Sequence, residues 1–145
     1  MDNQEKAIKN FETMNCNQAV FCTYGPKFGV DEKLCLKLGL AYGGGMGRQG
    51  RTCGAVTGAY TVIGLWCAEQ PAKEKAETKK LAFEKVQEFD RLFMEKNGSL
   101  ECKELLGYNL SIATEAQKIE TLGLFKTICP ELVGCSARIL DEILT

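Results

Sequence analysis

Cysteine is the residue type through which this chain could do chemistry. Its 145 residues include eight cysteines and no histidine. Without histidine, the chain cannot form a Cys-His or Ser-His-Asp catalytic arrangement, a Cys-His zinc finger or a C-x-x-C-H haem attachment site. In a reducing compartment, so many cysteines indicate metal binding or redox chemistry more than a disulfide framework. Any metal site must then be built from thiolates, carboxylates or main-chain atoms.

Four of the cysteines fall at the start of a predicted helix. The first-turn N–H groups of a helix are unpaired and carry partial positive charge, so they stabilise a thiolate. Hydrogen bonds of this kind also tune the reduction potential of iron–sulfur clusters. Because helix starts are common in a small bundle, coincidence is the alternative explanation. The four are Cys16 after the candidate cap Asn15, Cys53 after Thr52, Cys102 three residues beyond Ser99, and Cys129 before Pro130.

The other four cysteines lie elsewhere on their helices. Cys22, Cys35 and Cys135 fall in predicted helix bodies, and Cys67 falls at a helix end. Buried free cysteine often serves as a small apolar residue, which is the plain interpretation for this group. A disulfide or a second role stays open for them. No C-x-x-C occurs, so a thioredoxin-type pair is not indicated.

The elements that must position these residues are predicted to be helices. Apolar residues recur at helical spacing along the chain, whereas strand alternation is weak. We therefore expect an all-α fold, a compact single-domain bundle of about six helices spanning residues 1–145. The first predicted helix contains Ala7, Phe11 and Met14, and the last begins at Pro130. Residues 107–127 are predicted to be irregular or broken helix. The other predicted helices cover residues 15–25, 31–42, 52–67, 72–96 and 99–106.

A glycine-rich segment, residues 43–51, leads into Cys53. A phosphate cradle is weakly indicated, because the Lys-Ser/Thr of a P-loop is missing. A flexible turn is one alternative, and a bare backbone that approaches the sulfur site closely is another. Arg48 and Arg51 would then offset thiolate charge, unless they are simply solvated. Downstream, Gly54 and Gly58 share one helix face, and a close helix–helix contact is expected at Gly58.

Composition excludes several classes of protein. The formal net charge is −1, with 45% apolar and 26% charged residues, so neither nucleic-acid binding nor attraction to an anionic membrane is indicated. The polar N-terminus lacks the apolar region of a secretory signal. No apolar run is long enough for membrane insertion. We expect a cytoplasmic protein.

At this point the residues resemble a known family, the redox-active proteins named for their C-GCA-x-x-G-C-C pattern. The likeness covers nearly the whole chain and maps the four family cysteines onto the four helix-start positions. Cys22, Cys35, Cys67 and Cys135 lie outside it. Its segments are N-C-x-Q-A-V at 15–20, the glycine-rich stretch with C-G-A-x-x-G at 53–58, the segment 100–107 around Cys102, and C-P-E-L-V at 129–133 with A-R-I-L at 137–140.

The resemblance implies redox activity, and three hypotheses follow. In the first, Cys16, Cys53, Cys102 and Cys129 bind an iron–sulfur cluster, most plausibly [2Fe–2S], and pass electrons to a redox partner protein. In the second, metal-free cysteines carry out thiol–disulfide chemistry. In the third, the four cysteines hold a structural zinc ion. Whether the protein is an electron carrier or an oxidoreductase, and whether it forms a homodimer, stays open.

Overall fold

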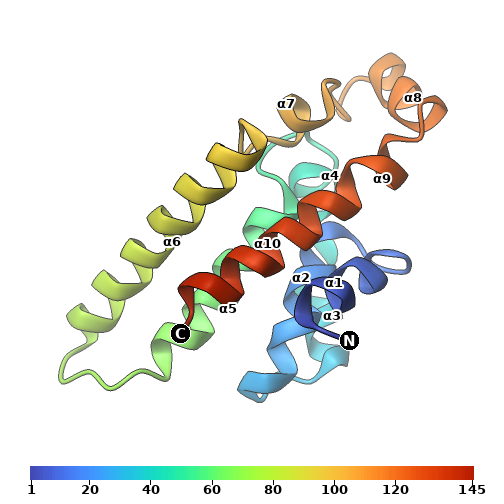
Figure 1. Ribbon diagram of the computed structural model, residues 1–145. Coiled ribbons are helices and arrows are strands. Elements are labelled where there is room, and N and C mark those ends of the chain that lie inside the picture. Colours follow the sequence, from blue (N-terminus) through green and yellow to red (C-terminus); the bar gives the residue numbers. More distant parts are fainter.

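The computed structural model describes all 145 residues and contains helices but no strands (Figure 1). The predicted all-α class is confirmed, although short helical segments are more numerous than expected. The α-helices are α1 (Asn3–Phe11), α2 (Cys16–Tyr24), α3 (Glu32–Gly39), α4 (Gly43–Met46), α5 (Gly54–Ala68), α6 (Lys75–Asn97), α7 (Cys102–Leu106), α8 (Ala113–Thr121), α9 (Leu124–Thr127) and α10 (Cys129–Ile143), and the 3-10 turns are η1 (Gly25–Phe28) and η2 (Leu40–Tyr42).

The C-terminal helix α10 organises the bundle. It contacts α1, α2, α5, α6 and α9, and α2 packs closely on α5. Figure 1 shows the long helix α6 running alongside α10, with α1, α2 and α3 grouped on the opposite side. None of the helices has both the length and the apolar content that crossing a membrane requires.

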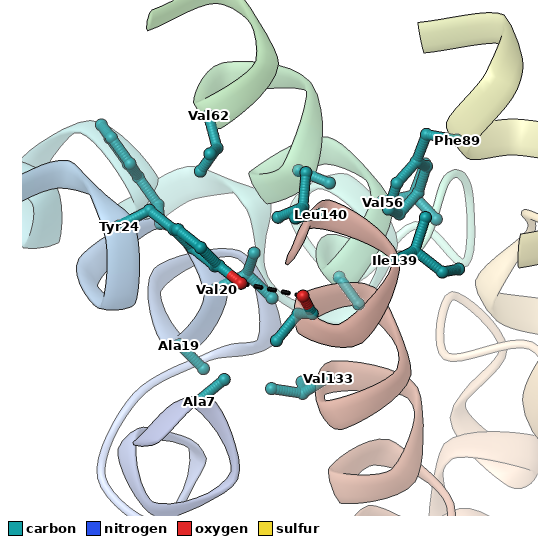
Figure 2. Packing of buried hydrophobic residues seen from close by; sticks show 14 of the residues in the cluster. Ala7, Ala19, Val20, Tyr24, Val56, Val62, Phe89, Val133, Ile139 and Leu140 are labelled. Carbon is teal, nitrogen blue, oxygen red and sulfur yellow. Dashed lines mark hydrogen bonds between the residues drawn. The ribbon is translucent and has the colours of Figure 1, made fainter. Parts of the chain in front are cut away.

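The main core fills the space among α2, α5, α6 and α10. Val20, Val56, Phe89 and Leu140 are fully buried there, and Figure 2 shows their side chains converging. The Tyr24 hydroxyl lies 2.8 Å from the carbonyl oxygen of Ala137, to which it can donate. This contact joins the end of α2 to the middle of α10, so both ends of the chain are fixed around one core.

A second, smaller core lies under α7, α8 and α9. It consists of five buried residues, Cys102, Leu106, Leu110, Ile119 and Cys129. Broken helix was predicted for residues 107–127, and the separate helices α8 and α9 confirm it. This cluster matters for function because two of its five members are cysteines.

Two of the predicted helix caps are wrong. The N-cap of α7 is Glu101 rather than Ser99, and the N-cap of α5 is Cys53 itself rather than Thr52. The reason is a single antiparallel bridge between Thr52 and Glu101, which keeps both residues extended just before their helices begin. A local signal for helix start was overridden by a contact between distant segments.

Candidate four-cysteine site

The structure brings the four predicted site cysteines together around one cavity of about 180 Å³. Cys53, Cys102 and Cys129 are buried, and Cys16 is half-buried. Cys53 belongs to the main core, Cys102 and Cys129 belong to the small core, and Cys16 packs against both. The cavity therefore lies where the two cores meet.

Apart from the cysteines, the cavity wall is almost entirely apolar, with no acidic or basic residue and no tyrosine. Sulfur is thus the chemically active element of the site. The apolar side chains were not singled out from the sequence, because a leucine facing this cavity has the same helical spacing as one facing the core. They are Phe11, Met14, Leu105, Leu106, Leu110, Phe125 and Leu132.

Cys16 is placed by a reciprocal helix cap. Asn15 is the N-cap of α2, and its side chain accepts a hydrogen bond from the backbone N–H of Gln18 (2.8 Å). The Gln18 side chain accepts one in return from the backbone N–H of Asn15 (3.0 Å). The cap predicted at Asn15 is confirmed, and the capping box that it forms with Gln18 fixes Cys16 as the first residue of α2.

Cys53 and Cys102 are aligned with each other by the bridge that precedes their helices. The backbone N–H of Cys53 donates to the Leu100 carbonyl (2.8 Å), and the N–H of Cys102 donates to the Arg51 carbonyl (2.7 Å). Two short extended segments therefore run side by side and deliver one cysteine each to the same end of the bundle. No sequence signal identified this pairing.

The sulfur of Cys53 lies at the N-terminus of α5, where the nearby backbone N–H groups of Ala55 and Val56 lower its pKa. Burial outweighs them and raises the pKa of Cys53 to about 12. Donors of this type were expected from the placement at a helix start. When a bound metal keeps Cys53 in its thiolate form, these N–H groups would help to stabilise the negative charge on its sulfur.

Glycine backbone approaches the cysteines closely, as one of the three interpretations of the glycine-rich segment anticipated. Gly45 has a left-handed backbone (φ 73°), and a Cβ on it would lie 2.7 Å from Cys102 Cβ. A Cβ on Gly54 would lie 2.8 Å from Cys16 Cβ. Both distances are too short for real atoms, so the cysteines can reach the cavity only because these two positions lack side chains.

Cys16 and Cys129 form a hydrogen-bonded thiol pair. The bond to Cys129, together with burial, raises the pKa of Cys16 well above its usual value. The same bond lowers the pKa of Cys129. Cys16 is therefore the donor, and Cys129, the first residue of α10, is the thiol that ionises first.

Cys102 is influenced by one of the two arginines considered from the sequence. Burial and the neighbouring Cys129 and Glu101 raise the pKa of Cys102 to about 11, and Arg48 opposes this rise. The charge-offsetting role proposed for the arginines is thus supported for Arg48 at Cys102.

The remaining four cysteines lie outside the cavity. Cys22 and Cys35 are buried neighbours between α2 and α3. Cys67 is buried near the end of α5, and Cys135 in α10 accepts a hydrogen bond from the Asn97 side chain (3.5 Å). None of them joins the four-cysteine site.

The four thiols can be compared with the ligand sets of known metal centres. No three His, Cys, Asp or Glu side chains lie close enough to share one metal ion. A structural zinc ion needs its sulfur ligands about 2.3 Å from a single point. A [2Fe–2S] cluster distributes its four thiolate ligands over two iron atoms. The set of four thiols fits the binuclear group in number and type.

The fold and the site together define an all-α protein with a buried centre of four cysteines, each at a helix start. Comparison with family models identifies the family. Residues 14–143 match the family described as "Putative redox-active protein (C_GCAxxG_C_C)". The chain belongs to this family, as the resemblance of its motifs predicted. Neither the curated proteins nor the solved structures contained a match.

Proposed function

We propose that this redox-active-family protein transfers electrons through an iron–sulfur cluster, of the [2Fe–2S] type, bound by Cys16, Cys53, Cys102 and Cys129. The observation that carries the proposal is the convergence of these four thiols on one cavity that has no other ionisable lining residue. When bound, the cluster would supply one-electron transfer. Four cysteine thiolates are the usual ligand set of such clusters.

The electrostatics of the cavity support a positively charged guest. The negative charges of ionised Cys53, Cys129 and Cys102 all raise the pKa of Cys16. Four thiolates would therefore repel one another in the metal-free protein. Metal ligation requires the deprotonated thiolate, so binding releases protons and removes the source of the repulsion.

The chain's own residues would hold and insulate the redox centre. The backbone N–H groups of Ala55 and Val56 lower the pKa of Cys53, so they would stabilise negative charge on that ligand. The apolar lining, with Leu106 and Leu110 buried in it, keeps water away from the centre. Cys16 is the most exposed of the four ligands, so we place the contact with a redox partner protein near it. A reducing compartment such as the cytoplasm suits this proposal.

A second candidate function rests on the Cys16–Cys129 pair. A thiol with a lowered pKa beside a hydrogen-bonded second thiol is the arrangement needed for thiol–disulfide exchange. In this case Cys129 attacks a substrate disulfide, and Cys16 resolves the mixed disulfide. Cys53 and Cys102 would then be dispensable. A structural zinc ion, the third hypothesis, would draw on the same four thiolates.

The decisive experiment is purification without oxygen, followed by iron and sulfide analysis and an absorption spectrum. The cluster proposal expects coloured protein, with iron and acid-labile sulfide lost in each of Cys16→Ser, Cys53→Ser, Cys102→Ser and Cys129→Ser. Cys67→Ser and Cys135→Ser are matched controls, because these buried cysteines lie outside the cavity. Iron-free protein after anaerobic reconstitution would overturn the proposal. If only Cys16→Ser and Cys129→Ser abolish reversible oxidation, the dithiol function is correct.

A further inference from the structure

The structure holds a second pair of neighbouring thiols, Cys22 and Cys35, which the family pattern does not include. Cys22 lies in the second turn of α2 and Cys35 in the middle of α3, and their exposed fractions are 2% and 0%. The two thiols are near enough for each to influence the pKa of the other. No third metal-binding side chain completes a site with them. The pair is therefore equipped for sulfur–sulfur chemistry and not for metal binding.

The packing around Gly25 independently locates the Cys35 sulfur against α2. Cys22 and Gly25 are three residues apart, so they lie on the same face of the helical backbone. A Cβ on Gly25 would collide with Cys35 Sγ, which means that the sulfur occupies the space a side chain would fill. Cys35 also donates to the Val30 carbonyl (3.5 Å). Its sulfur is thus held one helical turn from Cys22.

Helix α3 is in turn connected to the cap that positions Cys16. The Gln18 side chain donates to the Leu36 carbonyl (2.8 Å), and the Asn15 side chain donates to the Gly39 carbonyl (3.0 Å). These are the two residues of the capping box of α2. A covalent link between α2 and α3 would therefore hold α3 in the position that supports the first turn of α2.

We propose that Cys22 and Cys35 form a reversible disulfide that joins α3 to α2 and thereby secures the helix start carrying Cys16. The oxidant is a small peroxide. The Cys35 thiolate attacks one peroxide oxygen and breaks the O–O bond, giving a sulfenic acid and hydroxide. The Cys22 sulfur then attacks the sulfenic sulfur and expels its oxygen as water. Overall, two thiols and hydrogen peroxide give one disulfide and two waters.

The surroundings of the pair predict slow oxidation. Burial, Cys35 and the carboxylate of Glu32 raise the pKa of Cys22 to about 12. Burial, Asp31 and Glu32 raise the pKa of Cys35. Few thiolates are present at neutral pH, so the disulfide forms under sustained oxidation and not in each turnover of the four-cysteine site.

Peptide mapping tests the link directly on the whole protein. After treatment with hydrogen peroxide, trypsin should release peptide 10–27 joined to peptide 34–37, two hydrogen atoms lighter than the separate peptides. Dithiothreitol should separate them. Because peptide 10–27 also contains Cys16, the Cys16→Ser variant should retain the link and Cys22→Ser should lose it. A link to any other cysteine, or free Cys22 and Cys35 while Cys67 and Cys135 are oxidised, would overturn the proposal.

Thermal unfolding tests the stabilising role. The disulfide closes a loop of 14 residues, from 22 to 35, and oxidation should raise Tm by roughly 5–10 °C. Cys35→Ser should abolish the rise, whereas Cys67→Ser should keep it. If Cys35→Ser does not fold, wild-type protein oxidised and then re-reduced provides the comparison. An unchanged Tm in protein whose link is proved by mapping would contradict the stabilising role.

Discussion

The thiol of Cys16 donates a hydrogen bond to the sulfur of Cys129, joining the first residue of α2 to the first residue of α10. These residues are far apart in sequence, yet their helices begin at the same cavity. The donated bond and the position at a helix start both favour the thiolate of Cys129. The two thiols therefore differ in role, with Cys16 as the hydrogen-bond donor and Cys129 as the more acidic thiol.

Replacing Cys16 should make Cys129 less acidic. In metal-free, reduced Cys16→Ala protein, burial still raises the pKa of Cys129, but the bond that lowers it is gone. A hydrogen bond from Cys16 stabilises the Cys129 thiolate, so the pKa of Cys129 should rise when that donor is removed. The measurement is the pH dependence of Cys129 alkylation by iodoacetamide, followed by peptide mass spectrometry. Cys67→Ala should leave the profile unchanged, and an unaltered profile in Cys16→Ala would refute the donor role.

A methyl group on Gly54 should destabilise the protein, whereas one on Gly64 should not. Both glycines lie in α5, where alanine is favoured over glycine by about 1 kcal/mol. A Cβ on Gly54 would press on Cys16 Cβ and the Asn17 nitrogen, both at 2.8 Å. Apart from the backbone of its own helix, a Cβ on Gly64 would meet no atom within 4 Å.

Gly54→Ala should therefore lose about 1–3 kcal/mol of unfolding free energy, and Gly64→Ala should gain up to about 1 kcal/mol. Denaturant unfolding of the metal-free proteins measures both. Because Cys16 is displaced, Gly54→Ala should also lower iron content after reconstitution, and Gly64→Ala should not. Equal stability of the two variants would show that α2 and α5 can separate at no cost.

The cysteines at helix starts were predictable because capping and periodicity are local properties. Asn15 and Gln18 are close in sequence, and the capping box they form is present in the structure. The start of α5 was displaced by one residue, because Thr52 is held extended by its bridge to Glu101. No pattern near Thr52 reveals a partner so far along the chain.

The contacts between cysteines could not be predicted from the sequence either, because they also join segments that are separated along the chain. Cys22 and Cys35 meet because Gly25 leaves space for a sulfur atom on α2, and nothing in either cysteine's local sequence indicates this. The family resemblance separated these two from the four site cysteines. Only in the folded chain do Cys22 and Cys35 become neighbours, between α2 and α3.

Replacing Asn15 by aspartate should destabilise the protein, although aspartate is a favourable residue at most helix N-caps. Aspartate is as good an N-cap as asparagine. However, the Asn15 amide also donates to the Gly39 carbonyl (3.0 Å), and aspartate would present a carboxylate oxygen to that carbonyl. Asn15→Asp should therefore cost about 1–3 kcal/mol of unfolding free energy, measured by denaturant unfolding at neutral pH.

The matched exchange is Asp2→Asn at the start of α1. Asp2 also forms a capping box, but it is exposed and its side chain serves only that cap. Its replacement should change stability by less than about 0.5 kcal/mol. Comparable losses for the two exchanges would mean that the cap alone, and not the contact with α3, determines the stability of this end of α2.

Alkaline pH should unfold the metal-free, reduced protein. The folded state raises the pKa of Cys22 and Cys53 to about 12 and that of Cys102 to about 11, against 9.0 for an unperturbed thiol. Between pH 9 and the raised pKa of each folded thiol, the unfolded chain has released protons that the folded chain retains. The free energy of unfolding therefore falls as pH rises. The stability conferred by the protonated thiols is complete below pH 9 and is lost progressively from about pH 9 to 12.

Denaturant midpoints at intervals from pH 8 to 10.5 measure this loss, at an ionic strength high enough to screen surface charge. Cys22→Ala removes one of the titrating thiols, so its midpoint should fall less steeply with pH than that of the wild-type protein. Protein loaded with the metal centre should also show a shallower slope, because ligated thiolates have already lost their protons. If the midpoint of the wild-type protein falls with pH no more steeply than that of Cys22→Ala, Cys22 has the same pKa in the folded and unfolded chain. The argument that burial raises the pKa of Cys22 would then be incorrect.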